Sequence, residues 1–244
     1  MHKPTDIGPN RTGVKTSPFD SRKTIQGAEE GTPAAGMADG HVLEVERVRW
    51  SREAMPVGTV PPPGTVKGVV KAIVETLEGN VPNVLIDKLG ERLAFERTGA
   101  RLYDALLAKF EAASVHDDGP TRADIEHIRD DERRHFGIVR DAMVQLGADP
   151  TAMTPCADIA GVASLGWIQV LGDPRTTLTQ ALDIMLAVEA ADNEGWTLLV
   201  ELAETMGFAD LARQFRVAIA EEEEHLVLVR TWASTAILGQ SRAG

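Results

Sequence analysis

Apolar residues recur every three or four positions from Thr65 onward, which is the spacing of one helix face. This pattern predicts a short amphipathic segment over Val66–Leu77 and then four long helices, each with one mainly apolar stripe. The four stripes run from Ile86 to Phe110, from Ile125 to Leu146, from Leu178 to Met206 and from Leu211 to Ala236. The sequence therefore predicts an all-α fold built on four long helices.

Capping signals predict where these helices begin and end. The run from Thr121 to Asp124 is typical of a helix start, and Gly147 and Gly207 are typical of helix ends. The third helix is expected to begin after Asp173-Pro174, because proline is favoured in the first turn. The connection from Gly147 to Asp173 is long, so we expect it to cross the bundle and to contain a short helix over residues 157–171.

Each stripe is interrupted near its middle by residues that can bind metal. These residues are Glu96 on the first helix, Glu132 and His135 on the second, Glu189 and Asp192 on the third, and Glu222 and His225 on the fourth. Unpaired carboxylates in a low-dielectric interior cost several kcal/mol each, and the stripes contain no Lys or Arg. We therefore expect protons or metal cations to neutralise them.

The Glu-x-x-His spacing places a carboxylate and an imidazole one turn apart on the same helix face. Two such pairs and two single Glu residues supply six ligands, enough for two metal ions: Glu96, Glu132, His135, Glu189, Glu222 and His225. The second pair lies in the run Glu221–Glu224, and only Glu222 of that run falls on the stripe. Glu221, Glu223 and Glu224 are expected to form a solvated acidic face.

The order single Glu, Glu-x-x-His, long crossover, single Glu, Glu-x-x-His resembles the ferritin-like superfamily of dinuclear metal carboxylate proteins over about residues 84–238. The resemblance, to rubrerythrins and bacterioferritins in particular, implies a four-helix bundle with one long crossover. It implies that Glu96, Glu132 and His135 serve one metal ion and Glu189, Glu222 and His225 the other. The Glu residues of the two Glu-x-x-His pairs would bridge the two ions.

Three residues near the expected ligands have open roles. Asp192 resembles the extra third-helix carboxylate of rubrerythrins, and it is either a ligand or an acceptor for a ligating histidine. Tyr103 and Trp196 each follow a single Glu by seven residues, and they are either redox outlets near the metals or core residues. Gly99 and Ala100 are expected to leave room for an oxidant or a small substrate. A metal-free hydrogen-bonded network is the alternative to the whole metal site.

Carboxylate and imidazole ligands without sulfur suit iron or manganese, and raw affinity would also admit zinc. We expect two metal ions, with iron first and manganese second. The resemblance, more than the composition, implies an oxidoreductase that reacts with dioxygen or hydrogen peroxide at a non-haem dinuclear centre, in the manner of a ferroxidase or peroxidase. An iron storage or sequestration protein and an oxygenase that acts on an unknown small molecule are the alternatives. A homo-oligomer, with a dimer favoured, is expected.

Residues 1–64 contain eight prolines and eight glycines and have no net charge, so we expect an irregular arm before a helical domain over 65–244. Within the arm, Val42–Trp50 alternates loosely, as a short strand does.

The composition narrows the function classes. The net charge of −12 argues against nucleic acid as a partner, and the single cysteine excludes a disulfide framework or a four-cysteine metal site. Residues 1–12 lack the apolar core of a signal peptide, and the longest apolar stretch, 159–171, is too short to span a bilayer. We therefore expect a cytoplasmic protein without a membrane partner.

Overall fold

The computed structural model describes residues 22–23, 26–27, 30, 40–61, 82–113 and 119–243. All secondary-structure elements among the described residues are helices and none is a strand, which confirms the expected all-α class. The helices are α2 (Gly40–Glu53), α4 (Pro82–Ala112), α5 (Arg122–Gln145), α6 (Pro155–Ala163), α7 (Leu165–Gly172), α8 (Leu178–Thr205) and α9 (Ala209–Ala243). No helix among the described residues is long and apolar enough to cross a membrane.

The chain divides into two compact units, Met1–Met55 and Pro56–Gly244. The expected amphipathic segment over Val66–Leu77 and the expected domain boundary after residue 64 lie outside the described residues.

The first unit contains helix α2, where a short strand was expected over Val42–Trp50; that expectation was wrong. The segment is rich in Glu and Arg, which favour helices, and an ion pair joins Arg49 to Glu46 one turn away. Its side chains are largely exposed, so the loose alternation does not reflect a buried strand face.

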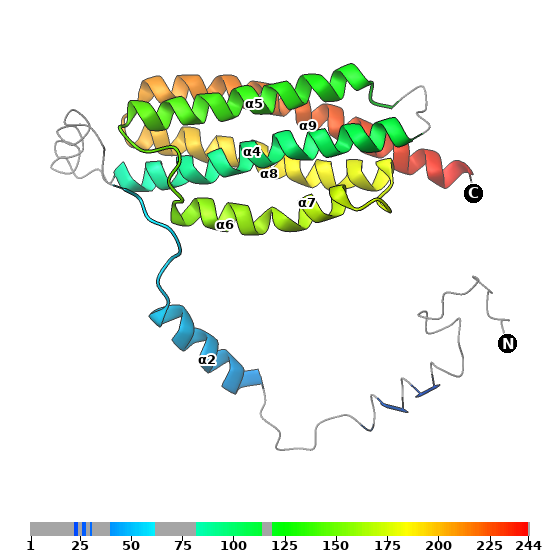
Figure 1. Ribbon diagram of the computed structural model, residues 1–244, viewed down its shortest axis with the longest axis horizontal. Coiled ribbons are helices and arrows are strands. Elements are labelled where there is room, and N and C mark those ends of the chain that lie inside the picture. Colours follow the sequence, from blue (N-terminus) through cyan, green and yellow to red (C-terminus); the bar gives the residue numbers. More distant parts are fainter. Residues whose placement is uncertain are drawn as a thin grey trace. The chain divides into compact units, whose positions relative to one another are not determined.

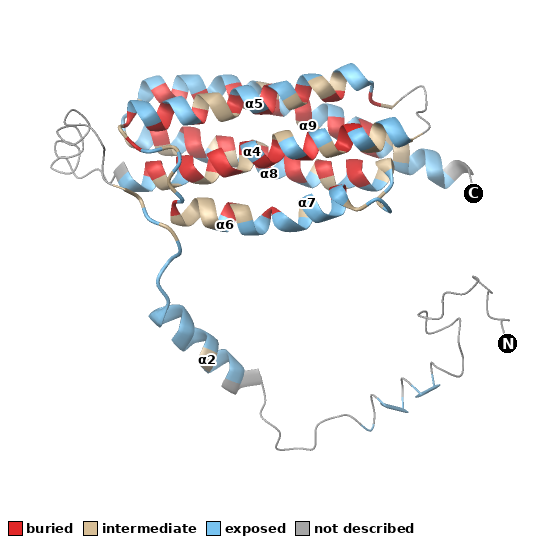
Figure 2. Ribbon diagram, viewed as in Figure 1, coloured by how far each residue is buried: buried red, intermediate tan, exposed pale blue. Residues whose placement is uncertain are grey.

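The second unit is built on four long helices that lie side by side (Figure 1). Helix α4 packs against α5 and α8, and α9 packs against α8 and α5. Helices α5 and α8 run in the direction opposite to α4 and α9, as the colour ramp in Figure 1 shows. Buried residues line the inner faces of all four helices (Figure 2). The predicted apolar stripes are therefore the faces that meet in the core.

Two apolar clusters fill the core of this unit, one toward each end. On α4 the first cluster takes residues 85–93 and the second takes residues 102–107. On α9 the first cluster takes residues 211–218 and the second takes residues 229–233. Helices α5 and α8 run in the opposite direction, so along them the residues of the second cluster come before those of the first. The interrupting Glu and His residues lie between the two clusters on every helix, so they form one polar layer across the middle of the core.

The crossover contains two short helices, α6 and α7, in place of the single expected helix over 157–171. The two helices meet at the buried Ser164, whose hydroxyl donates a hydrogen bond to the Ala160 carbonyl at 2.7 Å. The start of α6 is held against α4, because Thr154 donates a hydrogen bond to the Asp87 carbonyl at 3.3 Å. A Cβ on Gly90 of α4 would lie 2.3 Å from Thr154 Oγ1, so this close approach requires glycine.

The helix ends follow the sequence signals with one exception. Thr121 and Asp124 form the predicted capping box of α5, and Gly147 and Gly207 have positive φ angles of 78° and 79° just after α5 and α8. The predicted start of α8 at Asp173-Pro174 was wrong. Asp173 ends α7 and is bound by Arg175, and α8 begins at a second capping box between Thr177 and Gln180.

Candidate metal centre

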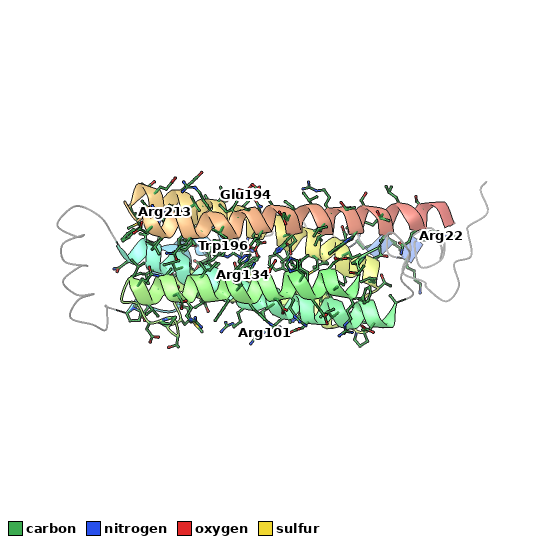
Figure 3. All side chains as sticks on the ribbon, turned by 90° about the horizontal axis from the view of Figure 1, so that it is seen from above. Arg22, Arg101, Arg134, Glu194, Trp196 and Arg213 are labelled. Carbon is green, nitrogen blue, oxygen red and sulfur yellow. The ribbon has the colours of Figure 1, made fainter. Side chains whose placement is uncertain are left out.

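The polar layer is shielded from solvent. Each of its seven residues is at most 2% exposed: Glu96, Glu132, His135, Glu189, Asp192, Glu222 and His225. The helix periodicity explains this burial, because each of these residues occupies a position on the inward stripe. Figure 3 shows the contrast on α8, where Trp196 lies in the interior while the exposed Glu194 lies on the outside.

The structure brings all six expected ligands together, along with Asp192. Within each of three groups, ligand atoms of all members lie within 4.8 Å of one another, close enough to hold a metal ion. The groups are Glu96, His135 and Glu222; Glu132, Glu189, Glu222 and His225; and Glu96, Glu132 and Asp192. Glu132 shares no group with His135, in contrast to the expected division of the ligands.

Glu222 lies between the two histidines. Its Oε1 is 2.6 Å from Nδ1 of His135, and its Oε2 is 3.3 Å from Nδ1 of His225. The two oxygens of one carboxylate therefore face two different imidazoles. This is the placement that a bridging carboxylate between two ions needs.

A carboxylate from the opposite helix binds the outer nitrogen of each histidine. Nε2 of His135 lies 2.7 Å from Glu221, and Nε2 of His225 lies 3.1 Å from Asp131. With the proton on Nε2 and shared with the carboxylate, the lone pair of each Nδ1 faces the polar layer. Arg134 joins the two acceptors, with contacts of 2.6 Å to Asp131 and 2.8 Å to Glu221.

Sequence reasoning missed these acceptors, and placing Glu221 on a solvated face was wrong. A signal was present: an acidic residue directly precedes the Glu of each Glu-x-x-His pair. Such a residue lies at the edge of the inward stripe, where it can reach a histidine of the neighbouring helix.

A buried arginine pairs with part of the layer. Arg92 is 5% exposed, with Nε 2.8 Å from Glu96 and Nη2 3.1 Å from Asp192. The expectation that only protons or metal cations neutralise the layer was therefore incomplete. Arg92 flanks the stripe of α4, and Gly195 of α8 makes room for it, because a Cβ there would lie 2.1 Å from Nη1. Asp192 thus has Arg92 as its partner, not a histidine.

The two aromatic residues with open roles both lie in the core. The Tyr103 hydroxyl is fully buried and donates a hydrogen bond to Glu189 Oε1. Burial and the nearby carboxylates raise the pKa of Tyr103 well above its usual value. The Trp196 ring packs edge-on against His135, with 5.7 Å between ring centroids. Tyr103 therefore both fills the core and binds a candidate ligand, while Trp196 supports a candidate histidine.

The space beside Gly99 is filled. A Cβ on Gly99 would lie 2.0 Å from Glu132 Oε2, so glycine allows the Glu132 carboxylate to approach α4. The expected room for an oxidant at this position is occupied by a candidate ligand.

The carboxylates of the layer have strongly shifted pKa values. Burial raises the pKa of Glu96 to about 7 and that of Glu189 to about 8. Burial and neighbouring carboxylates also raise the pKa of Glu132. For Glu222 the close approach of His135 and His225 outweighs burial and lowers the pKa to about 2. The metal-free layer therefore retains protons near neutral pH, and a bound cation would displace them.

The layer is not a satisfied metal-free network. The buried oxygens Glu132 Oε2 and Glu189 Oε2 accept no hydrogen bond. Orphaned acceptors in a dry core are costly, and a metal cation satisfies such atoms directly. The donor set of carboxylates and imidazoles therefore fits a metal site.

The pKa shifts predict how the stability of the metal-free protein depends on pH. Burial raises the folded-state pKa values of Glu96 and Glu189. The folded-state pKa of His225 is also raised, to about 9, because its contacts with Glu222 outweigh its burial. Such groups stabilise the fold below their unfolded pKa values, and this contribution is lost as pH rises through the folded values. The melting temperature of chelator-treated protein should therefore fall by about 5 °C or more between pH 5 and pH 9.

The control for this prediction is the same scan on protein loaded with a divalent metal ion. Because metal displaces the protons, the stabilisation by metal should grow as pH rises. A metal-free melting temperature that stays constant or rises from pH 5 to pH 9 would contradict the proposed protonation of the layer.

The outer acceptors give a second prediction. Asp131→Asn or Glu221→Gln should weaken metal binding by about 10- to 100-fold, because each removes the charge that orients a histidine and makes it more basic. Competition with a chelator of known affinity measures this change. Glu224→Gln is the matched control, since Glu224 is exposed on the same helix turn as Glu221 and should bind metal as the wild type does.

No protein-family model, curated protein or solved structure matches this chain.

Proposed function

We propose that the polar layer holds two divalent metal ions and that the chain is a dinuclear non-haem oxidoreductase on a ferritin-like four-helix bundle. The observation that supports this most is the charge of the layer. The described residues of the layer include five buried carboxylates, and the buried guanidinium of Arg92 contacts two of them. When all five carboxylates are ionised, these groups together have a charge of −4. Two divalent cations supply the matching positive charge.

The residues divide into two overlapping sets. Glu96, His135 and Glu222 would hold one ion, and Glu132, Glu189, Glu222 and His225 would hold the other. Carboxylate and imidazole ligands without sulfur suit iron or manganese, and iron is the first choice of the proposal. When bound, such ions supply redox chemistry toward dioxygen or hydrogen peroxide.

The protein contributes orientation, proton control and a dry environment. Asp131 and Glu221 fix the two imidazoles, and Arg92 holds Glu96 and Asp192. The Tyr103 hydroxyl holds a proton at Glu189 Oε1. The apolar clusters on both sides of the layer exclude bulk water, which strengthens electrostatic interactions within the layer. A metal-dependent oxidation in this environment would be insulated from solvent.

The proposal is tested by oxidation of the iron-loaded protein. Protein reconstituted anaerobically with ferrous iron is mixed with air-saturated or peroxide-containing buffer, and optical absorbance and oxidant consumption are followed in time. We expect oxidation of the bound iron at least about tenfold faster than that of the same iron in buffer. Glu223→Ala, which alters an exposed neighbour of the site, should match the wild type. Oxidation at the rate of free iron would contradict an oxidoreductase function.

A further inference from the structure

A cavity of about 450 Å³ lies between α4, the crossover helices and α8. Helix α6 packs along α4, but no Cα of α6 lies within 8 Å of a Cα of α8, so a gap remains between the two. Mainly apolar side chains line this gap, among them Val84, Phe95, Ile159, Trp167, Leu198 and Leu202. Its volume falls within the range of small-molecule pockets.

Aromatic rings and small residues shape the cavity. Phe95 and Trp167 meet edge to face with 5.8 Å between ring centroids, which joins α4 to α7 across the cavity wall. The α8 wall contains Ala191 and Gly195, and the α6 wall contains Ala163. These short side chains leave the space that larger residues would fill.

The cavity reaches the polar layer through Arg92. Of the lining residues, Arg92 is the one that contacts Glu96 and Asp192, and its guanidinium stacks on the Phe95 ring at 4.1 Å from the centroid. Each of the three guanidinium nitrogens of Arg92 makes one contact with Glu96 or Asp192. Because Nη1 and Nη2 each have two N–H groups, each of them retains a second N–H. Nη2 is buried, and its 3.1 Å contact with Asp192 Oδ1 lacks hydrogen-bond geometry. A donor that is almost fully buried therefore lies at the wall of an apolar cavity.

We propose that this cavity binds a small, uncharged, mainly apolar molecule of one or two rings that bears one acceptor oxygen directed at Arg92. The apolar walls would bury the ring, and a spare N–H of Arg92 would bind the oxygen. Charge favours an uncharged ligand. Glu96 and Asp192 already contact the guanidinium, so an anion would lose its hydration among apolar walls without gaining an unengaged counter-ion, while a cation would meet the guanidinium.

The test uses the full-length protein without metal, so it is independent of the proposed redox function. The probes are 1-naphthol and 1-naphthoate, which share a ring system and differ in charge at neutral pH. Isothermal titration calorimetry should show one saturable site for 1-naphthol, with affinity at least about tenfold higher than for 1-naphthoate. Quenching of tryptophan fluorescence gives a second readout, because Trp167 lines the cavity.

Matched variants locate the site. Ala163→Trp places a large ring in the cavity from an exposed position and should weaken 1-naphthol binding by at least about tenfold. Leu198→Asn, at the exposed lip on α8, should also weaken it. Val162→Trp, next to Ala163 on α6 but not part of the lining, should bind as the wild type does. The absence of saturable binding, or equal binding by Ala163→Trp, would overturn the proposal.

A second copy of the chain is the competing occupant of this apolar face. Analytical ultracentrifugation of the wild type and of Ala163→Trp distinguishes the two cases. A wild-type dimer that fails to bind 1-naphthol, together with a monomeric Ala163→Trp variant, would overturn the small-molecule proposal. Wild type that binds 1-naphthol without a change in sedimentation would support it.

Discussion

Replacement of Glu222 by alanine is expected to remove both metal ions from the protein. Glu222 is the residue whose two oxygens face both histidines, at 2.6 Å from His135 Nδ1 and 3.3 Å from His225 Nδ1. It also belongs to both groups that contain a histidine. Loss of this carboxylate takes a ligand from each ion and a negative charge from between them. Metal content should therefore fall from about two ions per chain to below about half an ion.

Metal analysis after anaerobic reconstitution and desalting measures this result. His225→Ala is the informative comparison, because it removes a ligand from one set alone and should leave about one ion per chain. Glu223→Ala, one residue away but exposed, should retain the wild-type content. If Glu222→Ala keeps as much metal as His225→Ala, then Glu222 is not shared between two ions.

Substitution of Gly99 by alanine is expected to have the second-largest effect. The new Cβ would lie 2.0 Å from Oε2 and 2.8 Å from Cδ of Glu132, a candidate ligand that is 1% exposed. The carboxylate must move away, and in the metal-bound protein this movement takes a ligand from the ions. We expect metal affinity to fall by about 10- to 100-fold. Overpacking should also destabilise the metal-free fold by about 1–3 kcal/mol.

Gly137→Ala is the matched control for Gly99→Ala. Gly137 lies within α5, and apart from its chain neighbours and the local helix backbone no atom lies within 4 Å of the position of its Cβ. Alanine there should stabilise the helix by roughly 0.5–1 kcal/mol and leave metal affinity unchanged. Chelator competition and thermal denaturation of both variants test the pair. A Gly99→Ala protein with wild-type metal affinity would show that the position of Glu132 does not depend on this contact.

Helix periodicity was sufficient to find the layer. A residue on an apolar stripe must face the core, so the positions of Glu96 and Glu189 predicted their burial before any packing was known. The same reasoning separated the buried Glu222 from the exposed Glu223 within one acidic run. The end of α5 was also predictable, since Gly147 supplies the positive φ that follows the helix.

Interactions between helices were not predictable in this way. Arg92, Asp131 and Glu221 lie beside the stripes, and they turn toward the layer only because a neighbouring helix presents a partner. The periodicity of a single helix contains no information about that neighbour. The start of α8 was misplaced for a local reason, because Asp173 binds Arg175 in a turn and leaves the capping role to Thr177.

The metal content of the wild-type protein tests the central claim most directly. With its carboxylates ionised, the layer has four negative charges beyond those offset by Arg92, and anaerobic titration with ferrous or manganous ion should saturate at about two ions per chain. Elemental analysis after removal of free metal gives the number. About two tightly bound ions is the expected result, whereas fewer than about one ion per chain would contradict a dinuclear centre.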